Sequence, residues 1–115
     1  MSKDHICAFN AEEYRDHLES LFPKVSFSVG RSYKNLGAGV NDCEVLLAFG
    51  AMPNDRVFQK NKSLKWVQAL GTGVGGIIDQ PNISSDTMAT SMRGIHGPQM
   101  SEMAFLLMLA LNRRF

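Results

Sequence analysis

The chemistry that this sequence could perform is concentrated in residues 64–76, which read LKWVQALGTGVGG. The segment begins as an apolar run and then carries four glycines within six residues, Gly71, Gly73, Gly75 and Gly76. An apolar run bounded by glycine is typical of a strand buried in a sheet. Glycines there let a ligand approach the main chain, and free N–H groups of a following helical turn favour an anion. The segment predicts a carboxylate or phosphate site, although a strand-ending loop without a ligand fits the same letters.

The same glycines match the dinucleotide fingerprint G-x-G-x-x-G at Gly71, Gly73 and Gly76. That fingerprint needs a helix directly after it and an acidic residue about 20 positions further on. Here Pro81 limits any helix after Gly76 to about two turns, and residues 90–96 contain neither Asp nor Glu. We therefore favour a loop for a small anion over a loop for a nucleotide.

Strand-like and helix-like segments alternate along the rest of the chain. Strands are expected at 5–9, 25–29, 44–49, 64–70 and 87–91, and helices at 10–22, 54–60 and 99–114. This alternation predicts an α/β fold, an open parallel sheet of about five strands with flanking helices and right-handed connections. Ligands bind such sheets beyond the carboxyl ends of the strands. The loops at 50–53, 71–76 and 92–97 all follow strands, so we expect them to share that edge.

Local patterns add detail to these elements. Asn10 and Asn54 are expected to cap the first two helices, and Val57 and Phe58 to point inward from the second. The strict alternation of residues 25–29 is typical of a strand that is covered more on one face, near a sheet edge.

Composition excludes several classes of protein. A chain of 115 residues is one domain by length, and 44% hydrophobic with 20% charged residues is typical of a soluble globular protein. The net charge of +1 indicates neither a nucleic-acid nor a membrane partner. The longest apolar run, 103–111, is far shorter than the about 20 residues of a membrane span. Cys7 and Cys43 lack metal-ligand spacing and predict buried thiols. With no signal peptide at the N-terminus, we expect a cytoplasmic protein.

The last predicted helix has almost no polar face. Between Met100 and Leu111 nearly every residue is apolar, and a helix that is apolar all round has to be buried on all sides. At the end of a small domain one face can pack on the sheet, and the other needs a second domain or a second copy of the chain. We therefore expect a domain at 1–97, an interdomain or dimerisation helix at 98–115, and a homodimer through residues 98–114.

Two stretches, LKWVQALGTGVGGIID and RGIHGPQMSEMAFLLMLALNRRF, resemble the D-isomer-specific 2-hydroxyacid dehydrogenases. The resemblance covers this whole chain but only the front part of such an enzyme. It implies that residues 1–97 form a flavodoxin-like substrate-binding domain. It also implies that the last helix leads toward a Rossmann nucleotide-binding domain, which is absent from this chain, and that the helix contributes to a dimer interface.

The resemblance assigns roles to individual residues. The family holds the substrate carboxylate with main-chain N–H groups of the loop that reads Gly71-Thr72-Gly73-Val74 here, with Thr72 and Gly73 as the donors. Ile95 matches a position that lines the substrate pocket, and loop packing is its alternative role. Met100 matches a cofactor-binding position near the nicotinamide, and Met52 a region that shapes substrate choice. Both methionines also fit a place in the core.

The sequence departs from the family pattern at two points. Gly75 and Gly76 stand where the family usually has Asp followed by His or Asn. The catalytic arginine, the carboxylate, the acid–base histidine and the true nucleotide fingerprint of the family have no match in this chain. His5, His17 and His96 match none of them; His17 is expected on an exposed helix face and His96 in a structural loop role. We expect this chain alone to bind no cofactor, whereas the full-length family uses NAD or NADP.

Three hypotheses about function follow. The first is a truncated D-2-hydroxyacid dehydrogenase, a substrate-binding domain for a small 2-oxo or 2-hydroxy acid that is inactive alone. The second is a non-enzymatic dimerisation or docking module. A flavodoxin-like FMN carrier is the weakest, because the loop after the first strand, 9–13, is acidic and lacks the Ser, Thr and Gly run that binds phosphate.

Overall fold

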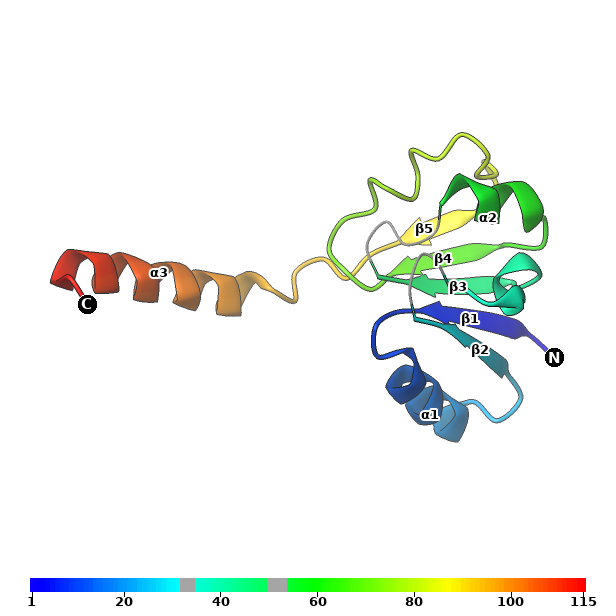
Figure 1. Ribbon diagram of the computed structural model, residues 1–115, viewed down its shortest axis with the longest axis horizontal. Coiled ribbons are helices and arrows are strands. Elements are labelled where there is room, and N and C mark those ends of the chain that lie inside the picture. The colour runs from blue at the N-terminus through cyan, green and yellow to red at the C-terminus, as the bar shows by residue number, and fades with distance from the viewer. Residues whose placement is uncertain (32–34, 50–53) are drawn as a thin grey trace.

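The computed structural model describes residues 1–31, 35–49 and 54–115. Five parallel strands form one sheet in the order β2-β1-β3-β4-β5, as Figure 1 shows. The strands are β1 (Lys3–Cys7), β2 (Ser26–Gly30), β3 (Val45–Ala48), β4 (Trp66–Ala69) and β5 (Met88–Thr90). The helices are α1 (Ala11–Leu21), α2 (Asp55–Lys60) and α3 (Gly97–Arg113), with a short 3-10 helix at Ala38–Asn41. The predicted α/β class, the parallel sheet and its five strands are confirmed.

The two faces of the sheet bury two separate groups of side chains, because successive residues of a strand point to opposite faces. On the face that α2 covers, the core contains Cys7, Leu46, Ala48, Val57, Phe58, Val67 and Ala69. On the other face, Ile6 and Ala8 pack with Ala11 of α1. The α2 face is the better covered, and the position of α1 beside β1 and β2 leaves β4 and β5 uncovered on its own face (Figure 1).

Most local expectations are confirmed, with one correction. The strand at residues 26–30 lies at an edge of the sheet, and Val57 and Phe58 are buried. Asn54 caps α2, because its Oδ1 accepts a hydrogen bond of 3.1 Å from the N–H of Arg56. Asn10 occupies the N-cap position of α1 but makes no side-chain capping bond, so that part of the expectation is wrong. Its φ of −109° and ψ of 39° depart from the extended backbone of a capping residue.

Helix α3 differs most from expectation. We expected one of its faces to pack on the sheet, yet no residue of α3 is buried, and Figure 1 shows the helix projecting away from the domain. The chain continues past the end of β5 without reversing, and the N–H of Met92 donates to the Gly71 carbonyl at 2.9 Å. Within the described residues, no helix combines the length and apolar character needed to cross a membrane.

Cys7 and Cys43 are buried and free, as expected. Burial raises the pKa of both thiols to about 12, so both are protonated near neutral pH and unreactive as nucleophiles. In the part of the chain that the structure describes, no group of three or more His, Cys, Asp or Glu side chains is placed to hold a metal ion.

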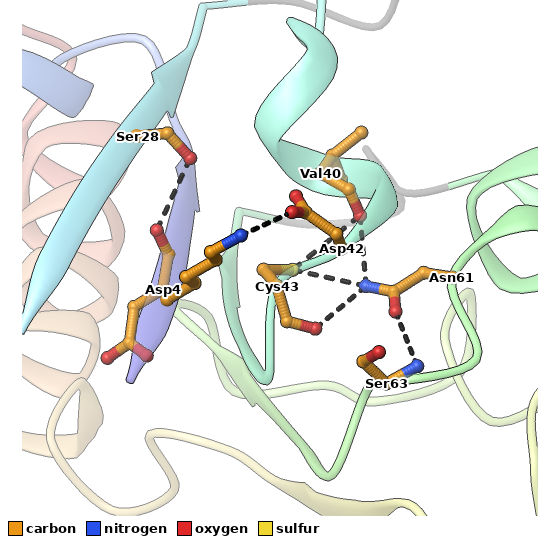
Figure 2. Close-up of polar contacts among 8 residues, drawn as sticks. Asp4, Ser28, Val40, Asp42, Cys43, Asn61 and Ser63 are labelled. Carbon is orange, nitrogen blue, oxygen red and sulfur yellow. Dashed lines mark hydrogen bonds and ion pairs between the residues drawn. The ribbon is translucent and has the colours of Figure 1, made fainter. Parts of the chain in front are cut away.

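A buried amide ties the loop after α2 to the loop before β3, as Figure 2 shows. Asn61 is 4% exposed, and its Nδ2 donates to the carbonyls of Val40 (3.0 Å) and Cys43 (2.9 Å). Its Oδ1 accepts from the N–H of Ser63 at 2.8 Å. One side chain therefore satisfies three backbone groups where no regular element can.

Replacing Asn61 with Ala removes these three hydrogen bonds from buried backbone groups, although the Val40 carbonyl keeps its 3.6 Å contact with the Cys43 thiol. We expect the free energy of unfolding to fall by about 2–4 kcal/mol, measured by urea denaturation. Asn82→Ala is the matched control, because Asn82 bonds the Asp55 carboxylate at the surface and its loss costs about 1 kcal/mol or less. Equal losses in the two variants would contradict a structural role for the Asn61 network.

Among the described residues, His5 is a second polar side chain that is buried in the core. Its Nδ1 lies 2.6 Å from Ser28 Oγ, and its Nε2 has no hydrogen-bond partner among the described residues. Burial lowers the pKa of His5, and the nearby Leu36 carbonyl offsets only part of that effect. Near neutral pH the folded protein therefore holds His5 as a neutral imidazole.

This predicts a pH dependence of stability. Above a pH of about 6.5 both the folded and the unfolded His5 are neutral. As the pH falls below that value the unfolded chain binds the proton first, so the free energy of unfolding decreases. Urea melts between pH 7.5 and 5.5 should show this decrease, and His5→Gln should flatten it. His17→Gln, on exposed α1, controls for the loss of a histidine, and an unchanged slope in His5→Gln would refute the assignment.

Candidate functional site

The glycine loop, residues 71–76, leaves the carboxyl end of β4 and is anchored on both sides. Before it, the N–H of Leu70 donates to the Ala48 carbonyl at 2.8 Å. After it, Ile77 is buried in the core on the α2 face, and its N–H donates to the Val74 carbonyl at 3.0 Å. Val74 itself packs against that core. The loop is therefore a short connection whose two ends are held in place at Leu70 and Ile77.

The main-chain N–H groups of the glycine loop are available to a ligand. None of them donates a hydrogen bond to a residue that the structure describes. A Cβ built at Gly71 or Gly73 would meet nothing within 4 Å, and neither residue has a positive φ. The chain's own packing thus does not require glycine at these positions. Free donors beside open space suit an anion that lies against the backbone.

A dinucleotide does not fit this loop. The fingerprint binds the pyrophosphate at the N-terminus of a helix, whereas residues 75–79 form turns and no helix follows Gly76. We therefore assign no cofactor chemistry to the loop. The loop lines none of five cavities formed by the described residues. Thr72, Gly73, Gly75 and Gly76 are exposed, so the loop forms an open shelf on the surface.

Three other residues were predicted to belong to the site, and the structure does not place all of them beside the glycine loop: Ile95, Met100 and Met52. The hydrogen bond from Met92 to Gly71 brings the segment after β5 beside the glycine loop, and Ile95 follows in that segment, 48% exposed. Met100 lies in α3, which projects away, and is 67% exposed. Neither side chain belongs to the core of this chain. Met52 lies outside the described residues.

His96 stands at the N-cap position of α3 and is exposed. Its carbonyl accepts the N–H of Met100 at 3.0 Å, and its side chain makes no capping bond. His96 therefore contributes a backbone hydrogen bond, and not a side-chain cap, to the start of α3.

Sequence reasoning missed an aromatic pair at the carboxyl edge. Phe9 follows β1 and Phe49 follows β3, two neighbouring strands, and their ring centroids lie 6.2 Å apart with an interplanar angle of 60°. Phe9 is 74% exposed and Phe49 47% exposed. The signal available in the sequence was a phenylalanine at the end of each of the predicted strands 5–9 and 44–49. The pair adds an apolar surface to the edge that carries the glycine loop.

The fold as a whole is similar to that of a known protein. A D-isomer specific 2-hydroxyacid dehydrogenase family protein from Aeromonas salmonicida subsp. salmonicida A449 superposes with a TM-score of 0.84 and 23% sequence identity. The match covers 99% of this chain and 36% of that chain, so this chain spans little more than a third of its length. At this identity the likeness establishes the fold. No protein-family model and no curated protein matches the sequence.

Alanine substitutions test whether the glycines serve the chain's own packing. Gly71→Ala and Gly73→Ala introduce a methyl group into open space, so we expect the free energy of unfolding to stay constant or rise by about 0.5 kcal/mol. Gly30→Ala is the contrasting control, because its Cβ would lie 2.6 Å from the Leu36 carbonyl oxygen and should cost about 1–3 kcal/mol. Thermal or urea unfolding measures all three. A loss at Gly71 or Gly73 as large as at Gly30 would show that these glycines are structural.

Proposed function

We propose that this chain is the substrate-binding domain of a D-2-hydroxyacid dehydrogenase and binds the carboxylate of a small 2-oxo or 2-hydroxy acid. The observation that carries the proposal is the glycine loop at the carboxyl edge of the sheet, whose N–H groups donate to no described residue and whose Gly71 and Gly73 have open space where a Cβ would lie. The fold similarity to a protein of that family supports it. The buried thiols of Cys7 and Cys43 support a cytoplasmic location.

In this proposal different residues contact different parts of the bound acid. The N–H groups of Thr72 and Gly73 donate to the carboxylate, as charge-assisted hydrogen bonds. Phe9 and Phe49 offer an apolar surface to the rest of the acid, and Ile95 approaches from the segment after β5. These elements bind and orient an acid at a backbone shelf.

Catalytic turnover needs chemical groups that the glycine loop does not supply. Hydride transfer requires a nicotinamide and an acid–base group beside the substrate, and the glycine loop does not suit a dinucleotide. We propose that the chain binds substrate without converting it, and that NAD or NADP would act only with a nucleotide-binding domain. Met100, in α3, would then lie on the path toward that domain.

A second candidate function rests on a separate observation, the exposed apolar surface of α3. It makes the chain a non-enzymatic module that dimerises or docks through this helix. The two candidates differ in ligand binding, since the docking module needs no acid at the glycine loop.

The deciding experiment is a titration of the isotope-labelled chain with pyruvate, followed by amide chemical shifts. We expect saturable shifts at residues 71–76 with a Kd of about 1 mM, because the shelf is open and the contacts are few. Gly73→Pro removes one N–H donor and should weaken binding roughly tenfold or more. Gly73→Ala keeps the donor and is the matched control.

Pyruvamide, which lacks the carboxylate charge, is the control ligand and should produce no saturable shifts at the loop. Equal responses to pyruvate and pyruvamide, or pyruvate shifts confined to other residues, would reject the proposed carboxylate site. Such a result would leave the docking module as the better account of the chain.

A further inference from the structure

A cavity of about 370 Å³ lies at the amino edge of the sheet. Its walls come from residues 61–64, which lead from α2 into β4, and residues 82–87, which lead into β5. Because β4 and β5 are parallel neighbours, these two segments lie side by side, whereas the glycine loop follows β4 at the opposite edge. A cavity of this size is at the small end of ligand pockets and suits a small metabolite.

Two opposite charges line this cavity without pairing, those of Lys62 and Asp86. Among the described residues, neither side chain belongs to an ion pair. Lys62 Nζ donates only a long hydrogen bond of 3.4 Å to the Phe58 carbonyl. A ligand that is only an anion would meet the repulsion of Asp86, and one that is only a cation would meet that of Lys62. The pair of charges therefore favours a ligand that carries both.

Two hydroxyl groups in the cavity wall have hydrogen-bonding capacity left over. Ser84 Oγ accepts the N–H of Asp86 at 3.3 Å, so its own hydrogen remains available to donate. Thr87 Oγ1 donates to the Leu64 carbonyl at 3.2 Å, so its lone pairs remain available to accept. The cavity thus offers a neutral donor for a carboxylate and a neutral acceptor for an ammonium group, beside the two charges.

The segment that carries Asp86 is held in place by the protein itself. The N–H and the Nδ2 of Asn82 donate to the Asp55 carboxylate, in the first turn of α2, at 3.1 and 2.7 Å. Ile83 packs against the core on the α2 face. A ligand would therefore meet a wall that is already ordered, which reduces the entropy that binding costs.

The cavity also has an apolar wall, formed by Phe58 and Leu64. Both belong to the core on the α2 face, so their positions are fixed by packing. An aliphatic group of a ligand that lies against this wall leaves water, which favours binding. The cavity accordingly combines a cation, an anion and an apolar surface.

We propose that this cavity binds a small zwitterion, an α-amino acid with an aliphatic side chain. Lys62 and Ser84 contact its carboxylate, Asp86 and Thr87 contact its ammonium group, and its side chain lies against the apolar wall. An α-amino acid carries the two charges on groups attached to one carbon and the aliphatic group on the same carbon, as this lining requires. The site is separate from the glycine loop, and the inference does not depend on the proposed binding of a 2-oxo or 2-hydroxy acid.

The test is a titration of the isotope-labelled chain with L-leucine, followed by amide chemical shifts. We expect saturable shifts at residues 61–64 and 82–87 with a Kd of about 1 mM. L-Alanine should bind more weakly, because its methyl group covers less of the apolar wall. Two analogues separate the charges: 4-methylpentanoate lacks the ammonium group of leucine, and 3-methylbutylamine lacks its carboxylate. Each should bind at least tenfold more weakly than leucine.

Charge-removing variants assign the two contacts. Asp86→Asn and Lys62→Gln should each weaken leucine binding at least tenfold, and both residues are exposed, so the fold is expected to persist. Asp86→Asn also keeps the bond to Ser84, which uses the backbone N–H. Glu19→Gln and Lys24→Gln remove the same charges at exposed positions outside the cavity and should leave the Kd unchanged.

Three results would overturn the proposal. The first is the absence of saturable shifts at residues 61–64 and 82–87 up to about 20 mM leucine, well above the expected Kd. The second is binding of either analogue at these residues as tight as that of leucine. The third is an unchanged Kd in both cavity variants. Because pyruvate is expected to shift residues 71–76, failure at this cavity is distinguishable from failure at the glycine loop.

Discussion

The structure depends on the parallel pairing of β1 with β2 on one side and with β3 on the other. Because β1 lies between them, the connection from β1 to β2 runs toward one edge of the sheet, and the connection from β3 to β4 runs toward the other. Right-handed connections that run in opposite directions place their helices, α1 and α2, on opposite faces. The carboxyl ends of β1, β3, β4 and β5 consequently meet at one edge. The glycine loop and the Phe9–Phe49 pair both follow strands at this edge, and Phe9 meets Phe49 although the two are far apart in the sequence.

This arrangement of strands and helices leaves two apolar surfaces without complete cover. A parallel sheet is normally covered on both faces, yet α1 packs mainly against β1 and β2, and no residue of α3 is buried. The glycine loop and the apolar groove beside α1, which Leu18, Phe22, Leu47 and Trp66 help to line, lie in different places, the first at the carboxyl edge of the sheet and the second on its face.

Several elements were predictable because their signals are local. Asn54 caps α2 through its own side chain, and Val57 and Phe58 are buried because helical spacing places them on the side that faces the sheet. The glycine loop was predictable as a strand-ending bend, since glycine density changes abruptly after Leu70. Asn10 shows the limit: its residue type suits a cap, but the backbone at that position departs from a capping geometry.

The sequence by itself determined the strand–helix alternation, the parallel α/β class and the apolar character of residues 100–111, because these follow from residue periodicity along the chain. Only the tertiary structure decided that α3 projects from the domain, that Asn61 bonds Val40 and Cys43, and that Phe9 meets Phe49. Each of these depends on contacts between segments distant in sequence. Periodicity specifies which side of an element is apolar, whereas the path of the chain in space decides what that side meets.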